Sequence, residues 1–192
     1  MVAALSLAAL LAAAPDPAAA LRDADASLRA ALEAGAGREE LARLAADRVD
    51  YRELARRSLG RHWSRLPERD RERVVAALRA LLEGTYLPRL APGARWTLAL
   101  RPARQAGRDA EVQAVATSGG QQVPLAFRLR HGDDGRWRIY DATVGGLALL
   151  EGYQEQLPQL LQLGGVPKLV ATLDAQRRAL QRPPVAGAPA AP

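Results

Sequence analysis

The chain has 192 residues, enough for one domain of ordinary size with short tails. It contains no cysteine, which excludes disulfides, thiolate nucleophiles and cysteine-ligated metal ions. The formal net charge of +6 comes from arginines spread along the chain rather than gathered in one basic run. This charge is compatible with nucleic acid or an anionic membrane, but no recognition helix or aromatic and basic strand motif favours a nucleic-acid binder.

The first twenty residues are typical of a secretory signal peptide. Residues 2–14 form an apolar run that is long enough for the core of such a peptide and too short to span a bilayer. The small-residue rule places the cleavage after Ala20, although no Lys or Arg precedes the run, and a cytosolic helix is the alternative. We therefore predict three parts: a signal peptide over 1–20, one folded domain over 21–180 and a disordered tail over 181–192, rich in Pro and Ala.

The next part of the chain has apolar residues at helical spacing. Asp50 followed by Glu53 has the form of a capping box, which marks the start of a helix. Helices are predicted over 21–34 and 38–49, from Asp50 to Leu59, and from Pro67 to Tyr86.

Between Arg95 and Val144 the apolar period changes to 2, which predicts four half-buried strands. Short turns separate the strands, so we expect an antiparallel meander with one apolar and one polar face. The apolar positions expected to share a face along the successive strands are Trp96, Leu98 and Leu100; Ala110, Val112 and Ala114; Val123, Leu125, Phe127 and Leu129; and Trp137 and Ile139.

Helical spacing resumes at Leu147, and Pro158 is expected to kink or divide the segment. The pair Gly164-Gly165 predicts a turn, after which Pro167 opens a last helix. N-terminal helices, a four-stranded antiparallel sheet and C-terminal helices together define an α+β fold, with helices on one face of a curled sheet.

The space between sheet and helices is either a filled core or an apolar pocket. Small residues are frequent there and aromatic residues are scarce, which favours a pocket. The side chains predicted to line it are Leu78, Leu82, Tyr86, Leu98, Val112, Val123, Leu125, Phe127, Ile139, Val144, Leu147, Leu150 and Tyr153.

Two ordered segments resemble the MlaC family. The first is 50–63, an aromatic-containing helix that leads into Leu59-Gly60-Arg61-His62-Trp63. The second is Trp137-Arg138-Ile139-Tyr140-Asp141, followed by a Gly146-Leu147 turn and by Tyr153. The resemblance covers about residues 38–175, and it departs from the family pattern at Gly145, Ala148 and Leu157.

The resemblance implies that residues 21–180 form a lipid-binding domain with a fold related to the NTF2-like cone, in which phospholipid acyl chains are held between sheet and helices. The head group would then lie near Arg128 or Arg138, although a solvated surface position is the favoured alternative for each arginine. It further implies a periplasmic shuttle that docks transiently on an inner-membrane ABC transporter complex and on an outer-membrane lipoprotein complex.

The sequence favours a protein that is not an enzyme and that has no cofactor or metal. Its histidines are His62 and His131, and it contains neither a zinc-protease motif nor a phosphate loop. The alternative is an NTF2-like small-molecule binding protein, or an isomerase-type enzyme with Asp141 as the general base.

Overall fold

The computed structural model describes residues 16–90 and 95–181. The helical first half consists of α1 (Pro17–Glu33), α2 (Arg38–Arg48), α3 (Tyr51–Leu59), η1 (Gly60–Arg65), α4 (Glu68–Tyr86) and η2 (Leu87–Arg89). The strands that follow are β1 (Thr97–Leu100), β2 (Arg104–Ala106), β3 (Asp109–Ser118), β4 (Gln121–His131), β5 (Trp137–Val144) and β6 (Leu147–Ala148). The last element is α5 (Leu149–Gln181), and the α+β class is confirmed.

The sheet has six strands rather than the predicted four, in the order β1-β3-β4-β5-β6, with β2 also paired to β3. All of these pairs are antiparallel. The two additional strands, β2 and β6, are too short for an alternating apolar pattern to reveal them. Leu147, expected to begin a helix, instead lies in β6, where it pairs with Val144 of β5.

Helix α1 begins at Pro17, earlier than the predicted start at Leu21. The Asp16 carboxylate accepts hydrogen bonds from the backbone N–H groups of Ala18 and Ala19, and Pro17 occupies the first helical position. Ala18 is buried against the sheet. Residues 1–15 of the predicted signal peptide lie outside the described residues, as does the predicted tail beyond Gln181.

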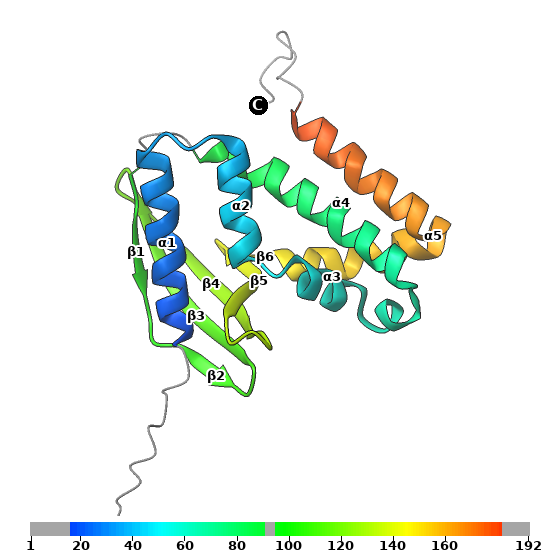
Figure 1. Ribbon diagram of the computed structural model, residues 1–192, viewed down its shortest axis with the longest axis horizontal. Helices are drawn as coiled ribbons and strands as arrows, with labels where there is room; N and C mark the ends of the chain where they lie inside the picture. The colour runs from blue at the N-terminus through cyan, green and yellow to red at the C-terminus, as the bar shows by residue number, and fades with distance from the viewer. Residues whose placement is uncertain (1–15, 91–94, 182–192) are drawn as a thin grey trace, which may run out of the picture.

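The long helix α5 is broken at Gly164 and Gly165 rather than at Pro158, which lies inside the helical segment. Gly165 has φ 65° and ψ −166°, a backbone conformation that is essentially restricted to glycine. Figure 1 shows the orange half of α5, beyond this break, running alongside α4.

Among the described residues there are three apolar cores: two include residues of the sheet, and the third is formed by Leu32, Leu41 and Leu87 of α1, α2 and η2. Leu21 of α1 packs on Val112, Leu129 and Trp137, so α1 covers the apolar face of the sheet. Figure 1 shows α3, α4 and α5 beside the sheet, next to β5, rather than above its centre. Their core is the larger one and includes Tyr51, Leu54, Leu59, Trp63, Leu78, Tyr140, Leu150, Leu157 and Leu169.

A β-bulge in β5 joins the two cores. Leu129 of β4 pairs with Ile139, whereas the preceding Arg128 pairs with Asp141, which leaves Tyr140 as the extra residue. Ile139 packs with the core under α1, whereas Tyr140 belongs to the core of α3, α4 and α5. One strand therefore contributes side chains to both cores.

Candidate functional site

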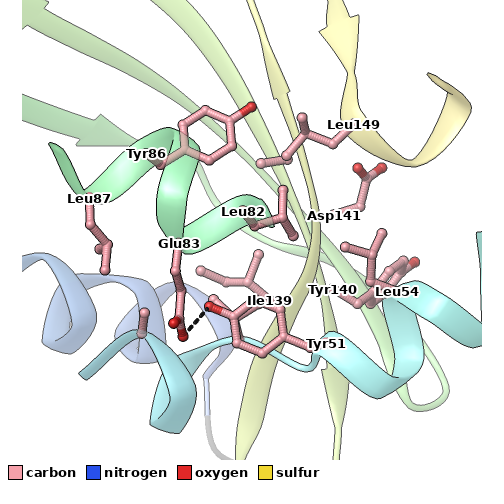
Figure 2. A pocket seen from close by; sticks show the side chains of 13 residues that line it. Tyr51, Leu54, Leu82, Glu83, Tyr86, Leu87, Ile139, Tyr140, Asp141 and Leu149 are labelled. Carbon is pink, nitrogen blue, oxygen red and sulfur yellow. Dashed lines mark hydrogen bonds between the residues drawn. The ribbon is translucent and has the colours of Figure 1, made fainter. Parts of the chain in front are cut away.

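The first cavity lies among α2, α3, α4 and β5 and has a volume of about 170 Å³ (Figure 2). Its surface is almost entirely apolar. The lining residues are Ala45, Val49, Tyr51, Leu54, Leu82, Glu83, Tyr86, Leu87, Ile139, Tyr140, Asp141, Ala142 and Leu149. A cavity of this composition suits an apolar ligand.

A second apolar cavity lies between α1 and the sheet and has a volume of about 310 Å³. Its lining residues are Leu21, Ala24, Asp25, Leu28, Leu90, Trp96, Leu98, Ala116, Leu125, Phe127 and Ile139. Among the described residues, Ile139 alone lines both this cavity and the first one. The two cavities are therefore neighbours across β5.

The few polar groups of the first cavity satisfy one another. The Tyr51 hydroxyl donates a hydrogen bond to the Glu83 carboxylate at 3.4 Å, and Arg79 pairs with the same carboxylate at 2.7 Å. Burial raises the pKa of Tyr51, and the nearby Glu83 carboxylate raises it further, so the phenol stays protonated. This cluster leaves the remaining wall of the cavity apolar.

Asp141 has both carboxylate oxygens engaged. Its Oδ1 accepts a hydrogen bond from the Leu150 backbone N–H at 3.0 Å, and its Oδ2 lies 3.5 Å from the Arg128 guanidinium. Only 1% of the side chain is exposed. The contacts of Asp141 are those of a helix cap rather than of a base with a free oxygen directed at a substrate.

The predicted lining residues fall into three groups. Leu82 and Tyr86 line the first cavity, Leu98, Leu125 and Phe127 line the second, and Ile139 lines both. Four are packed in or against the two cores: Leu78, Leu150, Tyr153 and Val112. The last three line neither cavity and belong to neither of these cores: Val123, Val144 and Leu147.

Leu147 and Val144 show why the apolar period alone does not identify the residues that line a cavity. Leu147 is 80% exposed and Val144 is 46% exposed, because they lie in the β5–β6 hairpin. Alternation along a strand identifies the face on which a side chain lies, but it does not show where the covering helices end.

Sequence reasoning did not identify the contribution of α1 and α2. Leu21, Ala24 and Leu28 line the second cavity from α1, at the spacing of one helical face. Ala45 and Val49 line the first cavity from α2 and the segment after it. The apolar stripe was visible in the sequence, but it did not indicate which surface the helix would cover.

The two arginines expected near a lipid head group are both in ion pairs and line neither cavity. Arg128 lies 3.5 Å from Asp141 and 4.0 Å from Glu111, and Arg138 lies 2.6 Å from Asp134. Because Arg128 follows Phe127 directly in β4, its side chain lies on the opposite, polar face of the sheet.

A charged cluster on this polar side ties α3 to the sheet. The nearly buried Glu53 pairs with Arg56 at 2.6 Å and with Arg57 at 2.7 Å. Arg57 also forms an ion pair with Asp109 of β3 at 2.7 Å, and Arg130 of β4 lies 3.3 Å from the same carboxylate. Burial raises the pKa of Glu53, but hydrogen bonds from Arg56 and Arg57 outweigh it and lower the pKa to about 2.

Within residues 16–90 and 95–181, no group of side chains is arranged to hold a metal ion. No helix in the same ranges is long and apolar enough to cross a membrane.

An α+β fold whose helices and sheet enclose neighbouring apolar cavities defines a binding protein for apolar ligands. The sequence matches the family described as MlaC protein over residues 19–175, and the chain belongs to this family. The resemblance seen in the two sequence segments is thereby confirmed.

A solved structure supports the same class. A phospholipid-binding protein from Ralstonia solanacearum, in complex with a phospholipid, superposes with a TM-score of 0.77 and is 26% identical in sequence. The match covers 88% of this chain and 100% of the other. No curated protein matches the chain.

Proposed function

We propose that this protein binds a phospholipid in the two apolar cavities and carries it between an outer-membrane lipoprotein complex and an inner-membrane ABC transporter complex. The observation that carries the proposal is the pair of apolar cavities that are neighbours at Ile139. The similar Ralstonia solanacearum protein, which was solved with a phospholipid, supports this ligand class.

Burial of acyl chains supplies the binding free energy in this proposal. Each methylene group removed from water contributes about 0.8 kcal/mol, so every ten methylene groups that the cavities enclose gain on the order of 8 kcal/mol. Such a gain offsets the loss of the membrane environment without a charged clamp or a chemical step. The protein therefore acts by binding and release rather than as an enzyme.

The proposed site of action is the periplasm. Proteins of the MlaC family are periplasmic, and the apolar run over residues 2–14 is the feature that would direct export. In this compartment the protein would meet both membrane complexes, and a fold related to the NTF2-like cone would shield the lipid during transfer.

The test is lipid mass spectrometry on protein purified without detergent from a bacterial periplasm, compared with a mock purification. Near-stoichiometric phospholipid is expected in the wild-type protein. Leu125→Arg should strongly reduce bound lipid because it places a cation in the second cavity. Leu147→Arg is the matched control, since Leu147 is exposed and lines neither cavity.

A well-folded wild-type protein without lipid would overturn the proposal. Equal loss of lipid in both arginine variants would also contradict it, because the effect would then not depend on the cavity.

A further inference from the structure

The apolar face of the sheet continues beyond the helices that cover it. Cross-strand pairs place Leu125 of β4 opposite Val144 of β5, and Val144 opposite Leu147 of β6. Residues paired in this way have their side chains on the same face, so Val144 and Leu147 extend the row that contains the cavity-lining Leu125. Yet Leu147 is 80% exposed and Val144 is 46% exposed. The β5–β6 hairpin is therefore an apolar edge that the described helices leave uncovered.

This hairpin adjoins the linings of both cavities. Leu149, which follows β6 directly, lines the first cavity together with Tyr86, which is 38% exposed (Figure 2). Leu125, the cross-strand partner of Val144, lines the second cavity. We use the name apolar mouth for the exposed side chains of Tyr86, Val144 and Leu147. They lie next to the walls that would hold acyl chains.

The tip of the hairpin is a tight, fixed turn. Gly145 and Gly146 both have positive φ, which a two-residue hairpin turn requires. The Gly145 backbone N–H donates a hydrogen bond to the Pro124 carbonyl oxygen at 3.0 Å, which ties the tip to β4. Because the backbone is already ordered, Leu147 loses little further backbone entropy when it enters an apolar phase.

The two ends of the sheet differ in charge. Asp133 and Asp134 lie in the β4–β5 turn, and Asp109 begins β3 at the same end. By contrast, residues 112–132 and 142–150, which include the β3–β4 turn and the β5–β6 hairpin, contain no acidic residue. An anionic surface is therefore repelled from the first end and not from the end that bears the apolar mouth.

Two arginines lie at the end with the apolar mouth. The guanidinium carbon of Arg89 is 5.8 Å from the centroid of the Tyr86 ring. Arg95, just before β1, is joined to the β3–β4 turn because its carbonyl oxygen accepts a hydrogen bond from the Ser118 hydroxyl at 3.0 Å. Both arginines are exposed, and neither forms an ion pair with a described residue. A bilayer presents phosphate groups above apolar chains, and exposed cations beside exposed leucine and tyrosine match these two layers.

We propose that the apolar mouth is a surface with which the protein contacts a phospholipid bilayer directly. Val144 and Leu147 enter the acyl layer, and Arg89 and Arg95 lie at the level of the lipid phosphates. The contact is reversible, because one hairpin and one tyrosine bury little apolar area. This inference goes beyond the proposed function, which names only protein complexes as docking partners. The contact brings the linings of both cavities to the membrane, so a lipid exchanges there without crossing water.

The experiment is flotation of the purified protein with vesicles of phosphatidylethanolamine and phosphatidylglycerol. Leu147→Ser is compared with Leu163→Ser, because Leu163 is 77% exposed at the break in α5 and does not belong to the mouth. Removal of a leucine from the acyl layer should lower the vesicle partition coefficient about tenfold in Leu147→Ser. Leu163→Ser should bind as the wild type does.

A second pair of variants tests the contribution of charge. Arg89→Gln should weaken binding to these anionic vesicles about fivefold, and it should have little effect on vesicles of phosphatidylcholine alone. Arg61→Gln is the matched control, because Arg61 is also exposed and without an ion pair among the described residues but lies in η1. Equal effects of the two arginine substitutions would overturn the proposed orientation at the membrane.

Two further outcomes would overturn the proposal. Wild-type protein that does not bind the vesicles would leave the apolar mouth to a protein partner, and equal effects of Leu147→Ser and Leu163→Ser would show that binding does not depend on the hairpin. Circular dichroism melting checks that each variant is folded. Lipid occupancy after equilibration should be unchanged in Leu147→Ser, since Leu147 lines neither cavity. Empty wild-type cavities with normal vesicle binding would refute the proposed function while supporting the membrane contact.

Discussion

The Asp141 carboxylate on β5 accepts a hydrogen bond from the Leu150 backbone N–H, 3.0 Å away, and so links the sheet to the first turn of α5. The first N–H groups of a helix have no partner within the helix, and a buried one needs an acceptor. Leu150 is buried in the core formed by α3, α4 and α5. Asp141 thus fixes where α5 leaves the sheet.

Asp141→Ala should lower the free energy of unfolding by about 1–3 kcal/mol, because it leaves the Leu150 N–H without its acceptor. Lipid bound per folded molecule should change much less than in Leu125→Arg, because Asp141 adds little to the apolar wall of the first cavity. Urea denaturation and lipid mass spectrometry measure the two quantities, and Asp174→Ala is a control at a more exposed ion pair. Unchanged stability with loss of ligand would instead favour a ligand-contacting role for Asp141.

Glu53 should make stability depend on acid pH. Its pKa in the folded protein is about 2, below the ordinary value of about 4.3 for the unfolded chain. The unfolded state therefore binds more protons between these values, so the stabilisation is complete above about pH 5 and is lost as pH falls towards 2. A shift of this size corresponds to about 3 kcal/mol, and screening at the half-exposed Arg56 should leave about 2 kcal/mol.

Glu53→Gln tests this expectation by thermal melting between pH 3 and pH 7. The variant should be less stable at pH 7 and should lose less stability on acidification than the wild type. Glu155→Gln, at an exposed position, should follow the wild-type profile. Parallel profiles for wild type and Glu53→Gln would contradict the assigned role of the cluster.

Two glycines of α5 should respond in opposite directions to the same substitution. Gly165→Ala places a Cβ at φ 65° and ψ −166°, and we expect a loss of about 1–3 kcal/mol. Gly152 lies inside the helix, and an added Cβ meets nothing within 4 Å, so Gly152→Ala should stabilise by about 0.5–1 kcal/mol. Chemical denaturation of both variants measures the sign, and a Gly165→Ala variant as stable as the wild type would contradict the break at Gly165.

The position of the N-terminus should affect stability. A chain that begins at Leu21, the predicted cleavage product, lacks the Asp16 cap and the buried Ala18. We expect it to be about 1–2 kcal/mol less stable than a chain that begins at Pro15. Urea midpoints of the two purified proteins provide the measurement. Equal midpoints would mean that the first turn of α1 contributes nothing to the fold.

Local patterns in the sequence predicted most elements because the signals for those elements are local. The capping box at Asp50 opens α3 as expected, with the Glu53 backbone N–H donating to the Asp50 carboxylate at 2.8 Å. The alternation along β3 and β4 predicted their pairing and their apolar face. Gly60, in the Leu-Gly-x-x-Trp element, has φ 51° and ends α3.

The candidate site was predicted less completely because it depends on contacts between distant segments. The apolar faces of α1 and the sheet were visible separately, but nothing local showed that Leu21 would lie on the sheet while Leu78 would lie in the other core. The bulge at Tyr140 likewise interrupts the alternation of apolar and polar residues from which the strand was predicted. Arg128 was expected near the lipid head group. Its ion pairs with Glu111 and Asp141 could be predicted only if the register of the strands were known.

The bulge in β5 has a consequence for the kinetics of folding. Ile139 and Tyr140 are adjacent in sequence but belong to different cores, so neither core is complete until β5 has docked on β4. The contacts of β5 with Val49, Asp50 and α3 span much of the chain, and such non-local contacts are formed at an entropic cost during folding. Docking of β5 on β4 would then complete the core under α1 and the core of α3, α4 and α5 in the same step. We therefore expect a single folding transition state that involves both the sheet and the helices.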